Sequence, residues 1–285
     1  FMLLNYEEHI ASQDAEWLVF IHGAGGSLQT WNRQVGALKK HFNLLLIDLR
    51  DHGNSKKEYK YGKIRYSFEL VSNDVIHLLD HLQLKNVHLV GVSVGSVIAR
   101  IIYETKPEIV KSLIFSGGMF QVNPKLGFLL KSGLILSTFL PFQAVYKLFA
   151  YLLMPRRNHR TSRKVFIRES IKIKQHEFNK WMVLCKDIRG ELKQLFRKKV
   201  NIPFLVVMGA EDHVFLKPAK RYATKHKNVD LMIIPKCGHV TNIEKASVFN
   251  NQVIYFMEKY FSEGVHNKEL LDINTSKNDY EYKIC

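Results

Sequence analysis

The sequence N-V-H-L-V-G-V-S-V-G-S-V-I-A-R-I-I-Y at residues 86–103 decides how the rest of the chain is interpreted. It begins with a short apolar run rich in β-branched residues, which is typical of a buried strand. The pentapeptide G-V-S-V-G at residues 91–95 follows, and beyond it apolar residues recur at helical spacing. A strand that turns directly into a helix leaves little room beside the turn, so glycines are favoured on both sides of the exposed residue. The stretch therefore predicts a strand, a tight turn that exposes the Ser93 hydroxyl, and a helix.

Short apolar runs alternate with helical patterns on both sides of this stretch. We expect further strands at residues 17–21, 43–49, 110–115, 204–208 and 231–234, and helices within 31–40, 66–84 and 246–261. Continuous apolar strands that alternate with helices predict an α/β fold, with a mostly parallel sheet covered by helices on both faces. Ligands of such sheets bind at the carboxyl ends of the strands.

Groups that can take part in a reaction follow four of these strands. A glycine-rich loop, H-G-A-G-G-S, follows the first strand, and Ser93, Asp212 and His239 follow three others. The loop lacks the glycine and lysine spacing of the phosphate-binding motifs, but its backbone amides can face an oxyanion. A hydroxyl, an imidazole, a carboxylate and an amide loop are the groups that nucleophilic acyl transfer requires.

The chain resembles the α/β-hydrolase fold family, in its serine esterase or lipase-like form with a helical cap. The resemblance covers roughly residues 15–261 and rests on motifs in the family's order: H-G-A-G-G at 22–26, D-L-R-D-H-G-N-S at 48–55, G-V-S-V-G at 91–95, G-A-E-D at 209–212 and G-H at 238–239. Asp51 and Ser96 stand where glycine is common in the family. The resemblance implies an α/β-hydrolase fold with a helical cap inserted into it.

The family's roles carry over to matching positions of this sequence. The resemblance implies that Ser93 is the nucleophile, that His239 takes and returns its proton, and that Asp212 orients His239. Glu211 is an alternative to Asp212, although the spacing of the motif favours Asp212.

The resemblance also implies an oxyanion hole formed by the backbone amides of Ala24 and Val94. We expect His22 and His52 to bond loop backbone rather than to take part in the reaction. No metal and no organic cofactor is expected, and the residues that bind the substrate are not assigned.

We predict a core domain at residues 1–118 and 202–263, a helical cap at 119–201, and a disordered tail at 264–285. The first half of the cap is rich in Leu, Phe and Tyr, which favours an apolar substrate. Its longest uncharged run, residues 132–146, has 15 residues. A membrane-spanning helix needs about 20, so this run does not predict one.

The net charge of +16 is concentrated in the predicted cap, where residues 119–200 hold 18 Lys or Arg and 4 Asp or Glu. A cap kept soluble by its lysines explains this charge. The alternative is attraction to an anionic substrate or surface, including weak contact between an anionic lipid surface and the basic residues 156–174. No nucleic-acid-binding motif accompanies the charge, so a nucleic-acid partner is not expected.

The three cysteines, Cys185, Cys237 and Cys285, are odd in number and far apart, which argues against a disulfide framework and a zinc site. The first eleven residues contain no apolar run typical of a signal peptide. We therefore expect a cytoplasmic protein, with peripheral membrane contact as the alternative.

The expected function is hydrolysis of carboxylic esters with an apolar acyl group through an acyl-enzyme. Two alternatives stay open. One is a different reaction on the same fold, namely C–C bond hydrolysis, thioester hydrolysis or a lyase step. The other is a ligand-binding relative that keeps the pocket without turnover.

Overall fold

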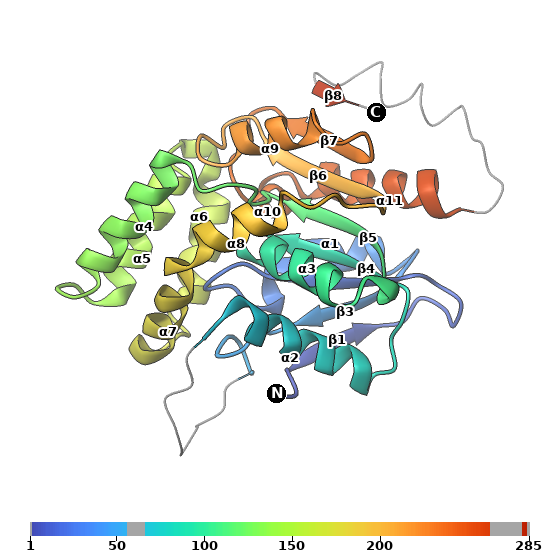
Figure 1. Ribbon diagram of the computed structural model, residues 1–285, viewed down its shortest axis with the longest axis horizontal. Helices are drawn as coiled ribbons and strands as arrows, with labels where there is room; N and C mark the ends of the chain where they lie inside the picture. Colours follow the sequence, from blue (N-terminus) through green and yellow to red (C-terminus); the bar gives the residue numbers. More distant parts are fainter. Residues whose placement is uncertain (1, 56–65, 263–280, 284–285) are drawn as a thin grey trace.

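The computed structural model describes residues 2–55, 66–262 and 281–283, and within them it contains an eight-stranded sheet (Figure 1). The strand order is β1-β3-β2-β4-β5-β6-β7-β8. These strands are β1 (Tyr6–His9), β2 (Trp17–Ile21), β3 (Asn43–Ile47), β4 (Val87–Val92), β5 (Val110–Ser116), β6 (Phe204–Gly209), β7 (Val229–Ile234) and β8 (Glu281–Lys283). Neighbours from β3 to β7 are parallel, and β1 and β8 pair antiparallel at the two edges. The predicted mostly parallel sheet is confirmed.

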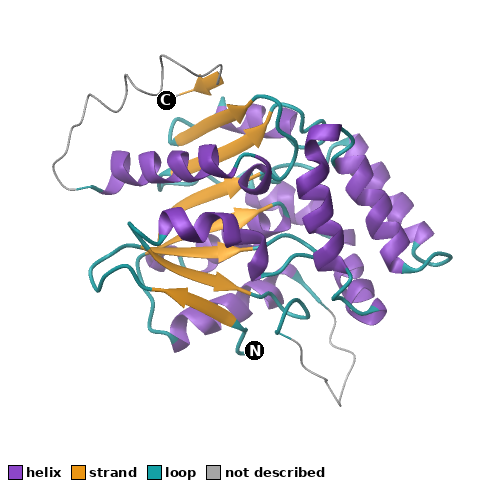
Figure 2. Cartoon of the chain, turned by 180° about the vertical axis from the view of Figure 1, so that it is seen from behind, coloured by secondary structure: helices purple, strands orange, loops and turns teal. Residues whose placement is uncertain are grey.

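Helices cover both faces of this sheet, as Figure 2 shows from behind. Alternate residues of each strand point to opposite faces, so a strand buried on both sides must be apolar throughout. In β2, Leu18 and Phe20 pack in the cluster that contains α1 (Asn32–Leu38) and α11 (Ala246–Phe261). Val19 and Ile21 pack in the cluster on the other face, with α2 (Phe68–His81), α3 (Val94–Thr105) and α9 (Leu216–Ala223).

A group of helices lies between β5 and β6, beside the carboxyl ends of the parallel strands (Figure 1). These helices are α4 (Pro124–Leu136), α5 (Phe142–Leu153), α6 (Arg160–Ser170), α7 (Gln175–Lys186) and α8 (Ile188–Leu195), with the short 3₁₀ helix η3 (Arg157–His159) before α6. We call this group the cap. The division of the chain into a core and a separate cap domain at residues 119 and 201 stays a prediction.

Two expectations need comment. The helix expected at residues 31–40 is instead the 3₁₀ helix η1 (Leu28–Trp31) followed by α1, because Ser27 caps the chain earlier by accepting a hydrogen bond from the Gln29 amide. Most of the tail predicted to be disordered, residues 264–280 and 284–285, lies outside the described residues, and residues 281–283 form β8. Among the helices described, none has the length and apolar character needed to cross a membrane.

Candidate active site

Ser93 lies at the turn between β4 and α3, with φ 53° and ψ −120°. This conformation is strained for a residue with a side chain, and such strain concentrates at functional sites. The two flanking glycines make the turn possible. A Cβ on Gly95 would lie 2.2 Å from the Ile21 carbonyl oxygen, and one on Gly91 would lie 2.7 Å from the Gly95 backbone. The predicted strand, turn and helix are present, and the steric reason for them holds.

Ser96 stabilises this turn from within the first turn of α3. Its hydroxyl donates to the Ser93 carbonyl oxygen at 2.5 Å and accepts from the Met119 amide at 3.1 Å. The serine that departs from the family's usual glycine therefore ties the turn to the segment that follows β5.

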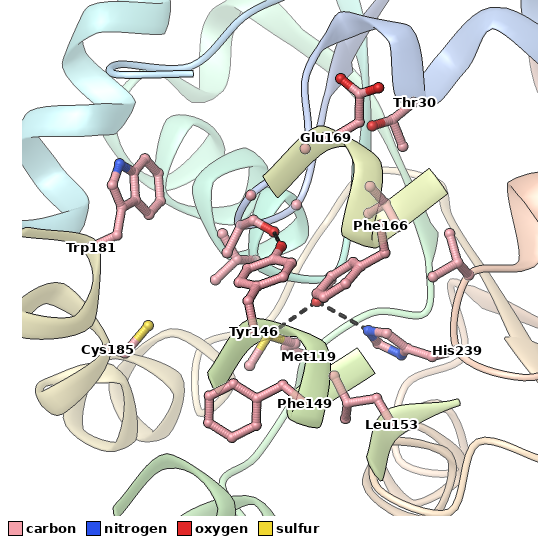
Figure 3. A pocket seen from close by; sticks show the side chains of 18 of the residues that line it. Thr30, Met119, Tyr146, Phe149, Leu153, Phe166, Glu169, Trp181, Cys185 and His239 are labelled. Atoms are coloured by element: carbon pink, nitrogen blue, oxygen red, sulfur yellow. Dashed lines mark hydrogen bonds between the residues drawn. The ribbon is translucent and has the colours of Figure 1, made fainter. Parts of the chain in front are cut away.

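The structure brings Ser93, His239 and Asp212 together at the carboxyl ends of β4, β7 and β6. The Ser93 hydroxyl lies 3.0 Å from His239 Nε2, a contact drawn as a dashed line to His239 in Figure 3. His239 Nδ1 lies 2.7 Å from Asp212 Oδ2. The other carboxylate oxygen of Asp212 accepts from the amides of Val214 and Phe215. Because both oxygens of the Asp212 carboxylate accept hydrogen bonds, its orientation toward His239 is fixed.

Glu211, the alternative partner for His239, points away from this chain of hydrogen bonds. Its carboxylate accepts from Arg156 at 2.5 Å and from Asn158 and His159 at 2.8 Å each. Burial raises the pKa of Glu211, but these hydrogen bonds outweigh burial and hold the pKa below its usual value. Glu211 thus fastens η3 of the cap to the core.

His22 and His52 hold the glycine-rich loop in place through backbone contacts. His52 Nε2 accepts from the Gly25 amide at 2.9 Å, while its Nδ1 lies 2.9 Å from the Arg50 carbonyl oxygen. His22 Nε2 accepts from the Leu49 amide at 3.0 Å. Both rings act as acceptors at Nε2, so both are neutral in this arrangement. Each bonds loop backbone, as expected from the sequence.

The residues expected to form the oxyanion hole, Ala24 and Val94, line the same cavity as Ser93 and His239. Tyr146 of α5 reaches this loop from the cap, and its hydroxyl donates to the Ala24 carbonyl oxygen at 2.5 Å. A Cβ on Gly25 would lie 1.8 Å from the Tyr146 hydroxyl, and Gly25 has φ +73°, so glycine is required here. Burial raises the pKa of Tyr146 well above its usual value, which keeps its hydroxyl a donor.

The cavity above Ser93 has a volume of about 160 Å³ and lies between the core and the cap (Figure 3). Its walls are mostly apolar and include Leu126, Leu129, Leu130, Phe149, Leu153, Phe166, Ile173, Phe178, Trp181, Met182, Ile188 and Phe215. The one ionised carboxylate among the described lining residues is Glu169, whose Oε2 accepts from Ser27 and Lys172. Burial raises the pKa of Glu169, but these hydrogen bonds outweigh it and lower the pKa.

Sequence reasoning did not find the roles of Tyr146, Glu169 and Ser96. Tyr146 and Glu169 belong to no motif, and Ser96 was noted only as a departure from the family's usual glycine. In the described part of the chain, no cluster of His, Cys, Asp and Glu is suited to a metal ion.

Because it contains buried histidines, we expect the protein to lose stability in mild acid. Burial lowers the pKa of His22 to about 4 and that of His52 to about 3, from an ordinary value of 6.5. Below pH 6.5 the unfolded chain binds protons at these sites and the folded chain does not. The free energy of unfolding is therefore fully retained above pH 6.5 and falls by roughly 1.4 kcal/mol per pH unit for each histidine as the pH drops toward 4. Urea unfolding at pH 7 and pH 5 measures this loss.

Replacing His52 with glutamine is expected to remove the contribution of His52 to this pH dependence, because glutamine keeps an acceptor and a donor but does not titrate. His41→Gln, at an exposed position, is the matched control and should leave the dependence unchanged. An equal stability of the wild-type protein at pH 7 and pH 5 would contradict the prediction.

Comparison with known proteins agrees with this architecture. A family model described as alpha/beta hydrolase fold matches residues 16–144. The dihydrolipoyllysine-residue acetyltransferase component of the acetoin cleaving system of Pseudomonas putida is 26% identical over 250 residues. That alignment covers 85% of this chain but 64% of the Pseudomonas protein, slightly less than two thirds of its length.

Two further relatives match along nearly their whole length. The 3-oxoadipate enol-lactonase 2 of Acinetobacter baylyi is 22% identical over 265 residues, which are 90% of this chain and 94% of that protein. The crystal structure of the enol-lactonase from Burkholderia xenovorans LB400 superposes with a TM-score of 0.74 at 20% identity, over 89% of this chain and 96% of that one. With the motifs in order and the sheet topology described above, these findings show that the chain has the α/β-hydrolase fold.

Proposed function

We propose that the protein is a serine hydrolase that cleaves neutral carboxylic esters with an apolar acyl group through an acyl-enzyme. The observation that carries this proposal is the chain of hydrogen bonds from Asp212 through His239 to Ser93, which opens into an apolar cavity.

The first half of the reaction transfers the acyl group to the enzyme. His239 Nε2, at 3.0 Å from the Ser93 hydroxyl, takes its proton while Ser93 Oγ attacks the ester carbonyl carbon. Asp212 keeps the proton of His239 on Nδ1 and stabilises the imidazolium that forms. His239 then returns the proton to the leaving alkoxide, and the alcohol departs.

The amides of Ala24 and Val94 would stabilise the negative charge on the tetrahedral intermediate. Each is placed at this cavity by an independent constraint: Val94 begins α3 directly after the Ser93 turn, and Ala24 is held through Tyr146. Losing one such donor typically costs about a hundredfold or more in rate. In the second half of the reaction, water replaces the alcohol, His239 removes its proton, and the acid is released.

The cavity favours a neutral acyl group. None of its described lining residues is a lysine or arginine, so the carboxylate of an acidic substrate would find no cation there. The one carboxylate in the described lining, Glu169, is already paired with Arg168 and Lys172, so it offers no free charge of either sign. An apolar cavity of about 150 Å³ holds a molecule of the size of benzene, which corresponds to an acyl group with on the order of six carbons.

Hydrolysis of a lactone, a cyclic ester, is the second candidate. It is favoured by the two enol-lactonase relatives, which this chain matches over 94% and 96% of their lengths. One of them is named for 3-oxoadipate, a dicarboxylate. The absence of cations among the described lining residues disfavours that substrate here and favours a neutral lactone.

A panel of p-nitrophenyl esters tests the proposal. We expect kcat/KM to be highest for acyl chains of about four to eight carbons and to fall for longer chains, because the cavity fills. An ester with a carboxylate at the end of a six-carbon acyl chain should be turned over at least a hundredfold more slowly than the neutral hexanoate, because burying an unpaired charge is costly.

The panel includes a γ-lactone, a thioester and a β-diketone of matched size. Fast turnover of the thioester or the diketone, with all esters equally slow, would contradict the proposal. A γ-lactone hydrolysed faster than every open-chain ester would select the second candidate.

A further inference from the structure

The α4–α5 hairpin carries large apolar side chains on its outer surface. Phe128 is 76% exposed, Ile135 55% and Phe139 81%. Leu140, Leu148, Tyr151 and Leu152 are also exposed on the same hairpin. Contiguous apolar surface of this kind marks an interaction site rather than ordinary surface.

These side chains form continuous stripes along the two helices. In α4, Phe128, Lys131 and Ile135 follow one another at spacings of three and four residues. In α5, Tyr151 lies four residues after Lys147 and three after Leu148, and Leu152 lies four residues after Leu148. Residues at such spacings share one face of a helix. We call the exposed residues of the two stripes and of the connecting turn the hairpin face: Phe128, Lys131, Ile135, Phe139, Leu140, Lys147, Leu148, Tyr151 and Leu152.

The opposite side of each helix already has its packing partners. Leu126, Leu129 and Leu130 of α4 line the cavity above Ser93, as do Tyr146, Phe149 and Leu153 of α5. The two helices also pack tightly on each other, since a Cβ on Gly133 would lie 2.0 Å from the Phe149 ring. The cap therefore does not need the exposed residues of the hairpin face for its own packing.

Basic residues accompany the hairpin face. Lys131 and Lys147 lie within its stripes, and Arg157, Arg160 and Lys164 are exposed on η3 and α6, next to α5. Within the described residues, these five basic side chains form no ion pair with a carboxylate. By contrast, Arg156 pairs with Glu211, and Arg168 and Lys172 pair with Glu169. The basic segment 156–174, considered from the sequence for lipid contact, is thus partly neutralised within the fold.

We propose that the hairpin face docks on an anionic lipid surface. Apolar side chains flanked by lysines and arginines match the boundary between acyl chains and anionic headgroups. The charge also disfavours a second copy of this chain as the occupant, because two hairpin faces would bring their cations together.

Docking at this face would place the cavity next to the lipid. The residues of the hairpin face and those that line the cavity lie on opposite sides of the same two helices, and a helix with its side chains is about 10–12 Å thick. Figure 1 shows the hairpin at the outer edge of the cap, with its connecting turn pointing away from the sheet. A neutral apolar ester dissolved in the bilayer would then have a short route to Ser93.

Flotation of the full chain with lipid vesicles tests this proposal without any measurement of turnover. Vesicles of phosphatidylcholine with 30% phosphatidylserine, as a chosen composition, are compared with pure phosphatidylcholine. We expect at least tenfold stronger partitioning onto the anionic vesicles at low salt, and a loss of this difference in high salt. Each basic residue near the surface contributes about a fivefold factor.

Paired variants separate the apolar and the charge contributions. Phe128→Ser with Phe139→Ser, and separately Lys131→Gln with Lys147→Gln, are each expected to lower partitioning at least tenfold. The matched controls are Ile10→Ser, an exposed apolar residue far from the cap, and Lys39→Gln with Lys40→Gln at the end of α1. The thermal unfolding curves of all of them should match that of the wild type, which shows that they are folded.

Equal partitioning of the wild type on neutral and anionic vesicles would overturn the proposal, as would losses in the controls as large as those in the hairpin variants. A dimer in analytical ultracentrifugation that Phe139→Ser dissociates would identify a second copy as the occupant instead. Ser93→Ala should bind vesicles as the wild type does, so a failed esterase assay leaves the vesicle result interpretable.

Discussion

Replacing Ser93 with alanine is expected to lower kcat/KM for a hexanoate ester by about ten-thousandfold or more, because no other hydroxyl stands 3.0 Å from His239 Nε2 in the described structure. Alanine has the same Cβ as serine, so the strained backbone at φ 53° costs no more than before and the fold is retained. Steady-state kinetics and covalent labelling with a fluorophosphonate measure the effect, and labelling should disappear in the variant.

Ser96→Ala is the matched control for this substitution. It removes the hydrogen bonds to the Ser93 carbonyl and the Met119 amide but leaves the proposed nucleophile in place. We expect it to lower kcat/KM by less than a hundredfold and to keep the label. Persistent labelling of Ser93→Ala, or activity near that of the wild type, would refute the role assigned to Ser93. An unlabelled but folded wild type would favour a ligand-binding relative without turnover.

The second large effect is expected for Asp212→Asn, which should lower kcat/KM by roughly ten-thousandfold. The amide group of asparagine can donate to His239 Nδ1, which favours the tautomer with its proton on Nε2. That tautomer has no lone pair with which to take the Ser93 proton, although the 2.7 Å contact and the fold can both persist. Kinetics with the hexanoate ester and a thermal unfolding curve distinguish this loss of activity from a loss of structure.

Glu211→Gln provides the comparison for Asp212→Asn within the same tetrapeptide. Its carboxylate contacts Arg156, Asn158 and His159 rather than His239, so we expect less than a tenfold loss of activity and a lower melting temperature. If Glu211→Gln lost more activity than Asp212→Asn, the assignment of the acidic residue would be wrong.

The sequence predicted the arrangement at the strand ends because short motifs there have steric causes. Gly91 and Gly95 are required by backbone that passes within contact distance, and this requirement is local. The departure at Asp51 has a local cause as well. The position has φ 61°, which explains the family's usual glycine, and aspartate tolerates this conformation better than most residues. Its carboxylate accepts from the Tyr66 hydroxyl.

The contacts between cap and core were beyond sequence reasoning. The sequence of α4 is apolar on nearly every side, so periodicity cannot tell which side faces the cavity. Glu244 shows a further limit. Its place before α11 does not reveal its partners, since its carboxylate accepts from the Gly238 amide and the Ser162 hydroxyl, each at 2.7 Å. The partners of Glu244 come from the cap and the His239 loop, and only the folded chain brings them together.

The contact between Tyr146 and the loop at Ala24 would couple the opening of the cap to the position of the proposed oxyanion-hole amide. Tyr146 belongs to α5, so lifting that helix to open a route into the cavity would withdraw the donor at the Ala24 carbonyl and the ring above Gly25. The loop that carries the Ala24 amide would therefore be held less firmly when the cap is open than when it is closed. Such an enzyme would turn over only after it has shut, which would shield the acyl-enzyme from bulk solvent during its formation.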